Sequence, residues 1–124
     1  MKQNKQILYV QTSGTDTPER LYSPLILAQT AKAMGLDATV YFLGLGLKAL
    51  VKSEAEKVKI GQFPTLLEVL EQTASQGVKI MACQQSMQLF GGQLSADDLF
   101  SQVTIVGAAT LNDLALDADA ILTF

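Results

Sequence analysis

Short runs of apolar and β-branched residues recur along the chain, and they constrain the fold more than any other feature of the sequence. Most of them are apolar at nearly every position, which is typical of parallel strands that are covered on both faces of a sheet. The runs occupy residues 7–12, 38–43, 78–83, 103–106 and 120–124. We therefore expect a mostly parallel five-stranded sheet between two layers of helices, a three-layer α/β/α fold.

Helical spacing fills the intervals between these runs. Apolar residues three or four positions apart extend from Leu21 to Ala31, and Gly35 follows as a stop. Pro24 inside this pattern implies either a kink or a later start of the helix. Further helices are expected over residues 64–76, from residue 95 and over residues 110–116, whereas residues 44–46 are expected to form a loop. One domain, residues 1–124, accounts for all of these elements.

Composition narrows the classes of function. Hydrophobic residues make up 48% of the 124 residues and charged residues 17%, as in a compact globular domain. The net charge is −3 without any basic stripe, so direct nucleic-acid binding is not expected. No apolar stretch approaches the roughly 18 residues of a membrane span, and the start of the chain lacks the pattern of a signal peptide. These observations predict a cytoplasmic protein without membrane association.

The chain has one cysteine and no histidine. It therefore forms no internal disulfide, and within a single chain it offers neither a zinc site of several Cys and His ligands nor a Cys–His nucleophile pair. A dithiol oxidoreductase needs a second cysteine to resolve its mixed disulfide. A persulfide carrier needs only one.

Ligands of open α/β sheets bind outside the carboxyl ends of the strands, which directs attention to the residues that follow the predicted strands. Cys83 ends the third run and precedes a predicted short helix over residues 84–90. Backbone N–H groups at a helix start lower the pKa of a thiol, so Cys83 is the candidate catalytic residue. Ser86 lies one turn away as a donor to sulfur, and Met87 is expected in an apolar wall. The candidate substrate-binding residues are Ser13, Gly14, Gly44, Gln84, Ser86 and Met87.

Several segments of the chain resemble one known family. They are residues 12–14, residues 33–42, the closing residues 118–124 and above all residues 77–87, with their Cys-x-x-Ser-Met segment. Together they resemble the DsrE/DsrF-like family of sulfur-relay proteins, in particular its stand-alone branch. The resemblance implies a flavodoxin-like fold, a persulfide on Cys83, and homo-oligomers that are trimers or multiples of trimers. We expect no cofactor. It also implies two partners, a rhodanese-like sulfurtransferase and a TusA-type sulfur carrier.

Several functions remain open at this point. The leading hypothesis is a sulfur carrier, with sulfurtransferase activity through Cys83, in sulfur trafficking or dissimilatory sulfur oxidation. The alternatives are a sulfur relay for tRNA thiolation and a noncatalytic structural subunit in which Cys83 is an inert core residue. Gly44, Gly46 and Ala49 fit a loose dinucleotide fingerprint, but after the second strand rather than the first. Leu45, Leu47 and Leu50 would indicate an oligomer interface if they are exposed.

Overall fold

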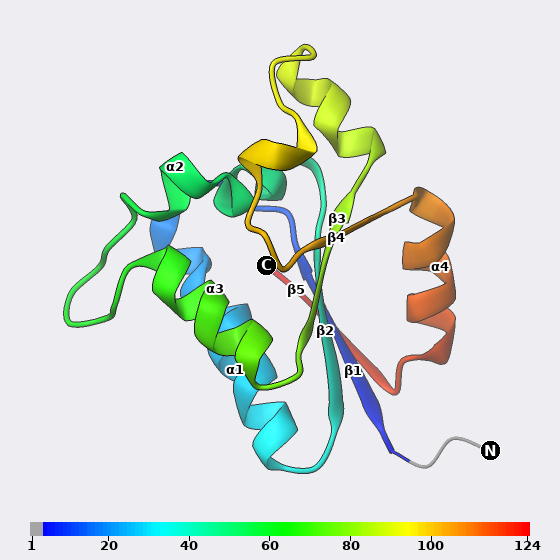
Figure 1. Ribbon diagram of the computed structural model, residues 1–124. Helices are drawn as coiled ribbons and strands as arrows, with labels where there is room; N and C mark the ends of the chain where they lie inside the picture. The colour runs from blue at the N-terminus through cyan, green and yellow to red at the C-terminus, as the bar shows by residue number, and fades with distance from the viewer. Residues whose placement is uncertain (1–3) are drawn as a thin grey trace.

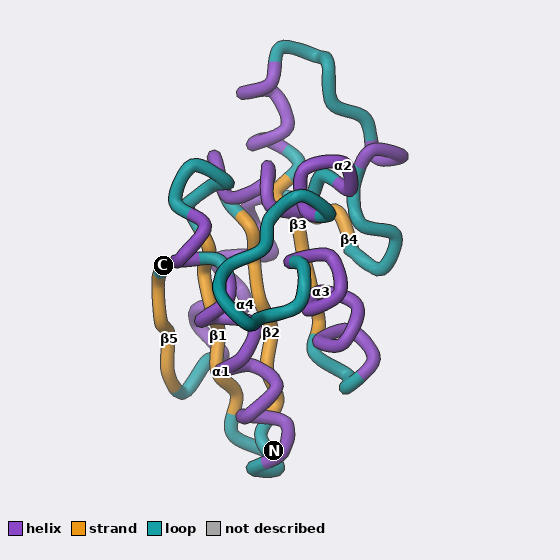
Figure 2. The backbone as a smooth tube through the Cα atoms, turned by 90° about the vertical axis from the view of Figure 1, so that its left-hand side faces the viewer, coloured by secondary structure: helices purple, strands orange, loops and turns teal. Residues whose placement is uncertain are grey.

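The computed structural model describes residues 4–124 and contains one five-stranded sheet. The strand order is β4-β3-β2-β1-β5, and every pairing is parallel. Figure 2 shows the strands side by side in this order. The strands are β1 (Gln6–Gln11), β2 (Asp37–Phe42), β3 (Lys79–Cys83), β4 (Thr104–Val106) and β5 (Ala120–Thr123). All five predicted runs therefore form strands.

Helices cover the two faces of the sheet unequally. Figure 1 shows α1 (Tyr22–Ala33) and α3 (Leu66–Ser75) on one face and α4 (Ala108–Asp117) alone on the other. Short helical segments connect the remaining parts of the chain: η1 (Pro18–Arg20), η2 (Gly44–Leu50), α2 (Lys52–Ala55), η3 (Gln85–Phe90) and η4 (Ala96–Asp98). This arrangement confirms the expected three-layer α/β/α fold. In residues 4–124 no helix is both long and apolar enough to cross a membrane.

Local sequence explains where the two helices of the first layer begin. Pro24 lies in the first turn of α1, where its missing N–H removes no hydrogen bond within the helix, so the helix starts late instead of kinking. α3 begins with a capping box. Thr65 Oγ1 accepts from the backbone N–H of Glu68 at 3.3 Å, and the Glu68 carboxylate accepts from the backbone N–H of Thr65 at 3.4 Å.

The stretch after β2 differs from its prediction. Residues 44–46 are the first turn of the 3-10 helix η2 rather than a loop. Leu47 and Leu50 are three residues apart, so they share one face of a helix with three residues per turn and point into the core. Both are completely buried, so they do not meet the condition for an oligomer interface; of the three leucines, Leu45 alone is exposed.

The sheet separates two apolar cores. The larger core lies on the side of α1 and α3. The smaller core contains Leu8, Val10, Tyr41 and Cys83, with Leu111 and Leu114 of α4 packed against it. Because side chains alternate along a strand, Tyr41 and Cys83 project from the same face of the sheet, the face that α4 covers.

Candidate functional site

Cys83 occupies the place that the sequence predicts for it. It is the last residue of β3 and lies opposite Val106 of β4. The backbone N–H of Gln84 donates to the Val106 carbonyl at 2.8 Å, which guides the chain from the strand into η3. Figure 1 shows η3, in yellow-green, projecting beyond the end of the sheet. The thiol therefore lies at the carboxyl edge, where parallel sheets bind ligands.

Hydrogen bonds around the Cys83 sulfur outweigh the effect of its burial. Burial by itself raises the pKa of the thiol, since the residue is only 2% exposed. The hydroxyl and backbone N–H of Ser86, the hydroxyl of Tyr41 and the backbone N–H of Gln85 act in the opposite direction. Their combined effect holds the pKa of Cys83 below its ordinary value. In the thiol form, the S–H group donates to Gln85 Oε1 at 3.6 Å.

Ser86 joins Cys83 to the first residue of η2, the helix that follows β2. Its Oγ accepts a hydrogen bond from the backbone N–H of Gly44 at 2.8 Å. The Ser86 hydroxyl proton therefore remains available for the sulfur. Gly44 has a φ of +61°, a left-handed conformation that glycine adopts without strain. Three of the predicted site residues, Gly44, Cys83 and Ser86, are thus connected in the structure.

Tyr41 is a residue of the site that the sequence interpretation assigned only to the buried sheet. Its ring is completely buried, and its hydroxyl donates to the Gly107 carbonyl at 3.1 Å. Burial and the neighbouring Cys83 raise the pKa of Tyr41 above its ordinary value. The alternation of side chains along a strand was the signal that could have identified Tyr41. A tyrosine in the carboxyl half of an apolar strand can share a face of the sheet with a cysteine that ends a neighbouring strand.

Ser13 and Gly14 lie in the loop after β1, and their contacts are with neighbouring segments of the chain. The Ser13 carbonyl accepts from Gln11 Nε2 at 3.1 Å. Gly14 packs against the backbone of Leu45, where an added Cβ would lie 2.8 Å from the carbonyl oxygen. The two residues therefore shape the loops at the carboxyl edge.

Gln84 and Met87 belong to the turn and the helix that follow Cys83. The Gln84 side chain is exposed, and this residue acts through its backbone. Met87 packs against the larger core, whereas Cys83 belongs to the smaller one. The structure thus groups Met87 with the larger core and not with the apolar residues around Cys83.

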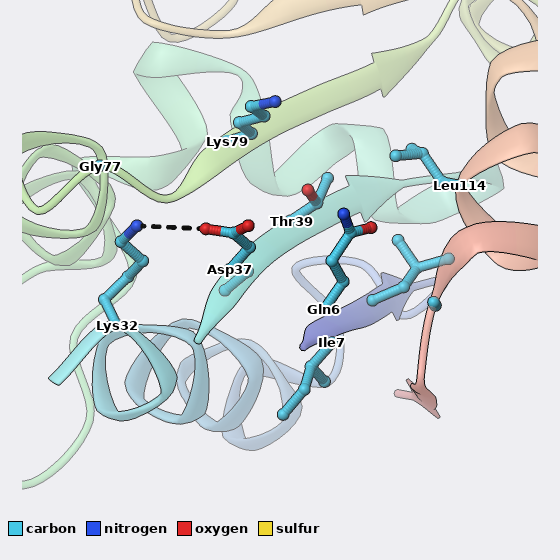
Figure 3. A pocket seen from close by; sticks show the side chains of 11 residues that line it. Gln6, Ile7, Lys32, Asp37, Thr39, Gly77, Lys79 and Leu114 are labelled. Carbon is cyan, nitrogen blue, oxygen red and sulfur yellow. Dashed lines mark ion pairs between the residues drawn. The ribbon is translucent and has the colours of Figure 1, made fainter. Parts of the chain in front are cut away.

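A cavity of about 200 Å³ lies at the opposite end of the molecule from Cys83. It is lined by the first residues of β1, β2 and β3 and by the end of α4. Figure 3 shows its Lys32–Asp37 ion pair, with 3.8 Å between Nζ and Oδ1. Since β3 starts at Lys79 and ends at Cys83, this cavity and the sulfur lie at opposite ends of the strand, and the cavity is not part of the candidate site.

Comparisons with known proteins agree with this architecture. The model of the DsrE/DsrF-like family matches residues 5–124. An uncharacterized protein of Methanocaldococcus jannaschii is 30% identical over 105 residues, which are 85% of this chain but only 38% of that longer protein. The crystal structure of the ychN protein from E. coli has a TM-score of 0.69 at 20% identity, covering 98% of this chain and 100% of that one. A protein of unknown function from Methanobacterium thermoautotrophicum has a TM-score of 0.68 at 14% identity, with 98% and 100% covered.

Proposed function

The chain belongs to the DsrE/DsrF-like family, and on that premise we propose that it carries sulfur as a persulfide on Cys83. Family membership supports a role related to sulfur relay. The observation that carries the proposal is the set of donors around Sγ, which lowers the pKa of a thiol that burial alone would keep neutral. A thiolate rather than a thiol is the nucleophile in sulfur exchange.

Loading is a transfer of neutral sulfur between two thiolates. The Cys83 thiolate attacks the terminal sulfur of a donor persulfide, and a new sulfur–sulfur bond forms at Sγ. The sulfur–sulfur bond of the donor breaks, and its electron pair leaves with the donor's thiolate. The proton of the terminal sulfur stays with that sulfur. No external oxidant or reductant is consumed, and the charge on the two sides is equal.

Unloading runs the same chemistry with Cys83 as the leaving group. An acceptor thiolate attacks the terminal sulfur, and the sulfur–sulfur bond to Sγ breaks to regenerate the Cys83 thiolate. A leaving thiolate of lower pKa departs faster. The hydroxyl and N–H groups that stabilise the nucleophile therefore also assist its departure, so one set of donors serves both half-reactions.

Because Cys83 is only 2% exposed, the site must open before a donor reaches the sulfur, and we propose that η3 is the segment that moves. Within η3, only Ser86 is buried, and Leu89 is 63% exposed. The helix ends at Gly91, which has a left-handed conformation with φ of +64°. A segment with so few buried contacts opens at lower free energy than the sheet.

Intact mass measurement tests the proposal. The protein is incubated with polysulfide and weighed before and after reduction, in parallel with Cys83→Ser. We expect additions of whole sulfur atoms on the native chain that disappear with reductant and are absent from the variant. A native chain that takes up no sulfur, while its thiol still titrates fully in denaturant, would overturn the proposal. That result would favour the noncatalytic structural subunit, a reading that the burial of Cys83 supports.

The wider setting that we propose follows from the family resemblance. The donor is a rhodanese-like sulfurtransferase and the acceptor a TusA-type carrier, in sulfur trafficking or dissimilatory sulfur oxidation, with tRNA thiolation as the alternative destination. Mixing the loaded chain with each purified partner and following the sulfur by mass distinguishes these routes. The protein acts in the cytoplasm in either case.

We also propose a homo-oligomer, a trimer or a multiple of one. Exposed apolar side chains on α4 and the edge strand β5 support this assembly: Leu116 is 84% exposed, Ile121 48% and Leu122 42%. Burying such side chains between subunits is favourable. Sedimentation should give a mass of at least three chains at micromolar concentration, and a monomer would contradict the assembly.

A further inference from the structure

We propose that Tyr41 is a second functional residue of the site, whose hydroxyl proton points to the Gly107 carbonyl while Cys83 is a thiol or persulfide and to Sγ while Cys83 is a thiolate. The inference rests on the proposed function, because it describes how the thiolate is stabilised as nucleophile and as leaving group. It adds a device in which the charge on sulfur, rather than a movement of the backbone, changes the hydrogen bonding.

The sheet register places the Tyr41 hydroxyl between the ends of two strands. Tyr41 pairs with Met81 of β3, and Met81 pairs with Thr104 of β4. The hydroxyl nevertheless reaches the carbonyl of Gly107, three residues beyond Thr104, at 3.1 Å. The ring therefore leans toward the carboxyl edge, where Cys83 lies two residues beyond Met81 on the same face. Both side chains belong to the smaller core.

The Tyr41 hydroxyl can donate to only one of its two acceptors, the Gly107 carbonyl or the Cys83 sulfur, at a time. A tyrosine hydroxyl has one proton to donate and can also accept. In the thiol form, Cys83 donates its own proton to Gln85 Oε1 at 3.6 Å, and Tyr41 donates to the Gly107 carbonyl. Once the sulfur has lost its proton, it becomes a charged acceptor. A hydrogen bond to an ionised acceptor is roughly twice as strong as one to a neutral carbonyl, so the hydroxyl turns to the sulfur.

The carbonyl that Tyr41 leaves keeps another donor. The Gly107 carbonyl also accepts from the backbone N–H of Thr110 at 3.2 Å, in the first turn of α4. Turning the hydroxyl toward the sulfur therefore creates no buried acceptor without a partner, which would be costly. The hydroxyl proton changes its partner by rotation about the C–O bond of the phenol.

Charged groups of the surrounding elements lie away from the two atoms. Asp37 and Lys79 share the face of the sheet, but they precede Tyr41 and Cys83 by four residues, about 13 Å along a strand. Charged side chains on the neighbouring helices, Asp113 and Asp117 of α4 and Lys48 of η2, are exposed, and η3 has none. Tyr41 and Cys83 are therefore the titrating groups that face each other.

Tyr41→Phe tests the inference, with Tyr9→Phe as the matched control. Tyr9 is also a buried strand tyrosine, and its hydroxyl also donates to a backbone carbonyl, that of Leu27 at 3.2 Å, but in the larger core. Thiol ionisation is followed by the NMR shift of the Cys83 β-carbon across a pH series, a readout that does not depend on access to reagents. Below the pKa, the thiolate fraction should fall roughly tenfold in Tyr41→Phe and stay unchanged in Tyr9→Phe.

Equal titrations for Tyr41→Phe and the native chain would overturn the role of Tyr41. That failure is distinct from failure of the proposed function, in which the native chain takes up no sulfur from polysulfide whatever its titration. If Tyr41→Phe does not fold, the ζ-carbon signal of Tyr41 in the native chain replaces it. This signal should move as Cys83 titrates and stay fixed over the same range in Cys83→Ala, and a signal that is stationary in both refutes the switch.

Discussion

Replacing Ser86 with alanine removes two hydrogen bonds from the site at once. Ser86 Oγ accepts from the Gly44 N–H at 2.8 Å, and the Ser86 hydroxyl donates to the Cys83 sulfur. The side chain is buried, so water does not replace it without some opening of the chain. We expect Ser86→Ala to destabilise the protein by an amount that depends on pH, because only one of the two bonds depends on the charge of the sulfur.

The size of the effect follows from the two bonds separately. The Gly44 bond is neutral and partly buried, so its loss costs about 1 kcal/mol at every pH. The bond to the thiolate is assisted by charge and contributes roughly 2 kcal/mol more where Cys83 is ionised. The folded-state pKa of Cys83 is lowered, so the stability that this group contributes is fully present above the pKa of an unfolded thiol. It is lost as the pH falls through the folded-state value.

The destabilisation by Ser86→Ala should therefore grow from about 1 kcal/mol in mildly acidic solution to about 3 kcal/mol above the pKa of a free thiol, about 8.5. Urea titrations at a series of pH values measure it. Ser75→Ala serves as the control, since the exposed Ser75 hydroxyl donates to the Gln72 carbonyl at 2.7 Å and its loss should change stability by less than about 0.5 kcal/mol.

Repeating the series in a Cys83→Ala background isolates the thiolate. Without the sulfur, Ser86→Ala should cost the same about 1 kcal/mol at every pH, because only the Gly44 bond remains. A pH-independent difference in the chain that retains Cys83 would refute the reasoning, since it would mean that Ser86 does not stabilise the thiolate. A pH-dependent difference that persists without Cys83 would refute it as well, by assigning the titration to another group.

Three further predictions concern packing, capping and access. Gly46→Ala should lower the free energy of unfolding by about 1–3 kcal/mol, because an added Cβ overlaps the Gln11 carbonyl oxygen. Gly107→Ala is the control: no atom lies within 4 Å of the added carbon, so this change should cost at most about 1 kcal/mol in the same urea titration. Equal losses of stability in the two variants would contradict the prediction. Thr65→Ala should cost about 1 kcal/mol through the lost capping box and leave the thiol titration unmoved; a shifted titration would show that α3 influences the sulfur. Cys83, only 2% exposed, should react with a bulky thiol reagent far more slowly in the native chain than in denaturant, and comparable rates would argue against opening of η3 as the limiting step.

The layered fold was predictable because its signals are local. Runs of apolar residues indicated the five strands, and apolar residues at helical spacing, with the stop at Gly35, indicated the helices between them. The 3-10 helix η2 was not predictable in the same way. Its start at Gly44 looks like a loop in sequence, and its conformation depends on Leu47 and Leu50 entering a core that other elements complete.

The residues of the candidate site also differ in whether local sequence was enough to predict them. Cys83 and Ser86 are neighbours in sequence, so the start of a short helix was enough to place them together, and Gly44 followed from the shared carboxyl edge of adjacent strands. Tyr41 required two facts that the sequence does not state. One is that β2 lies beside β3, and the other is the register that sets Tyr41 opposite Met81. Met87 required knowledge of which core η3 packs against.

Burial of Cys83 is commonly a sign of an inert core cysteine, and burial by itself raises the pKa of its thiol. Removing water strengthens each hydrogen bond to a thiolate, because fewer competing donors screen the charge. In the proposed function, a persulfide at this buried position is shielded from free thiols, which would otherwise remove its terminal sulfur. A buried carrier then needs internal donors, and Ser86, Tyr41 and the first N–H groups of η3 provide them. An inert core cysteine requires no hydrogen-bond donors to a thiolate. The hydrogen-bond donors around the sulfur, and not its burial, therefore distinguish a sulfur carrier from a structural subunit.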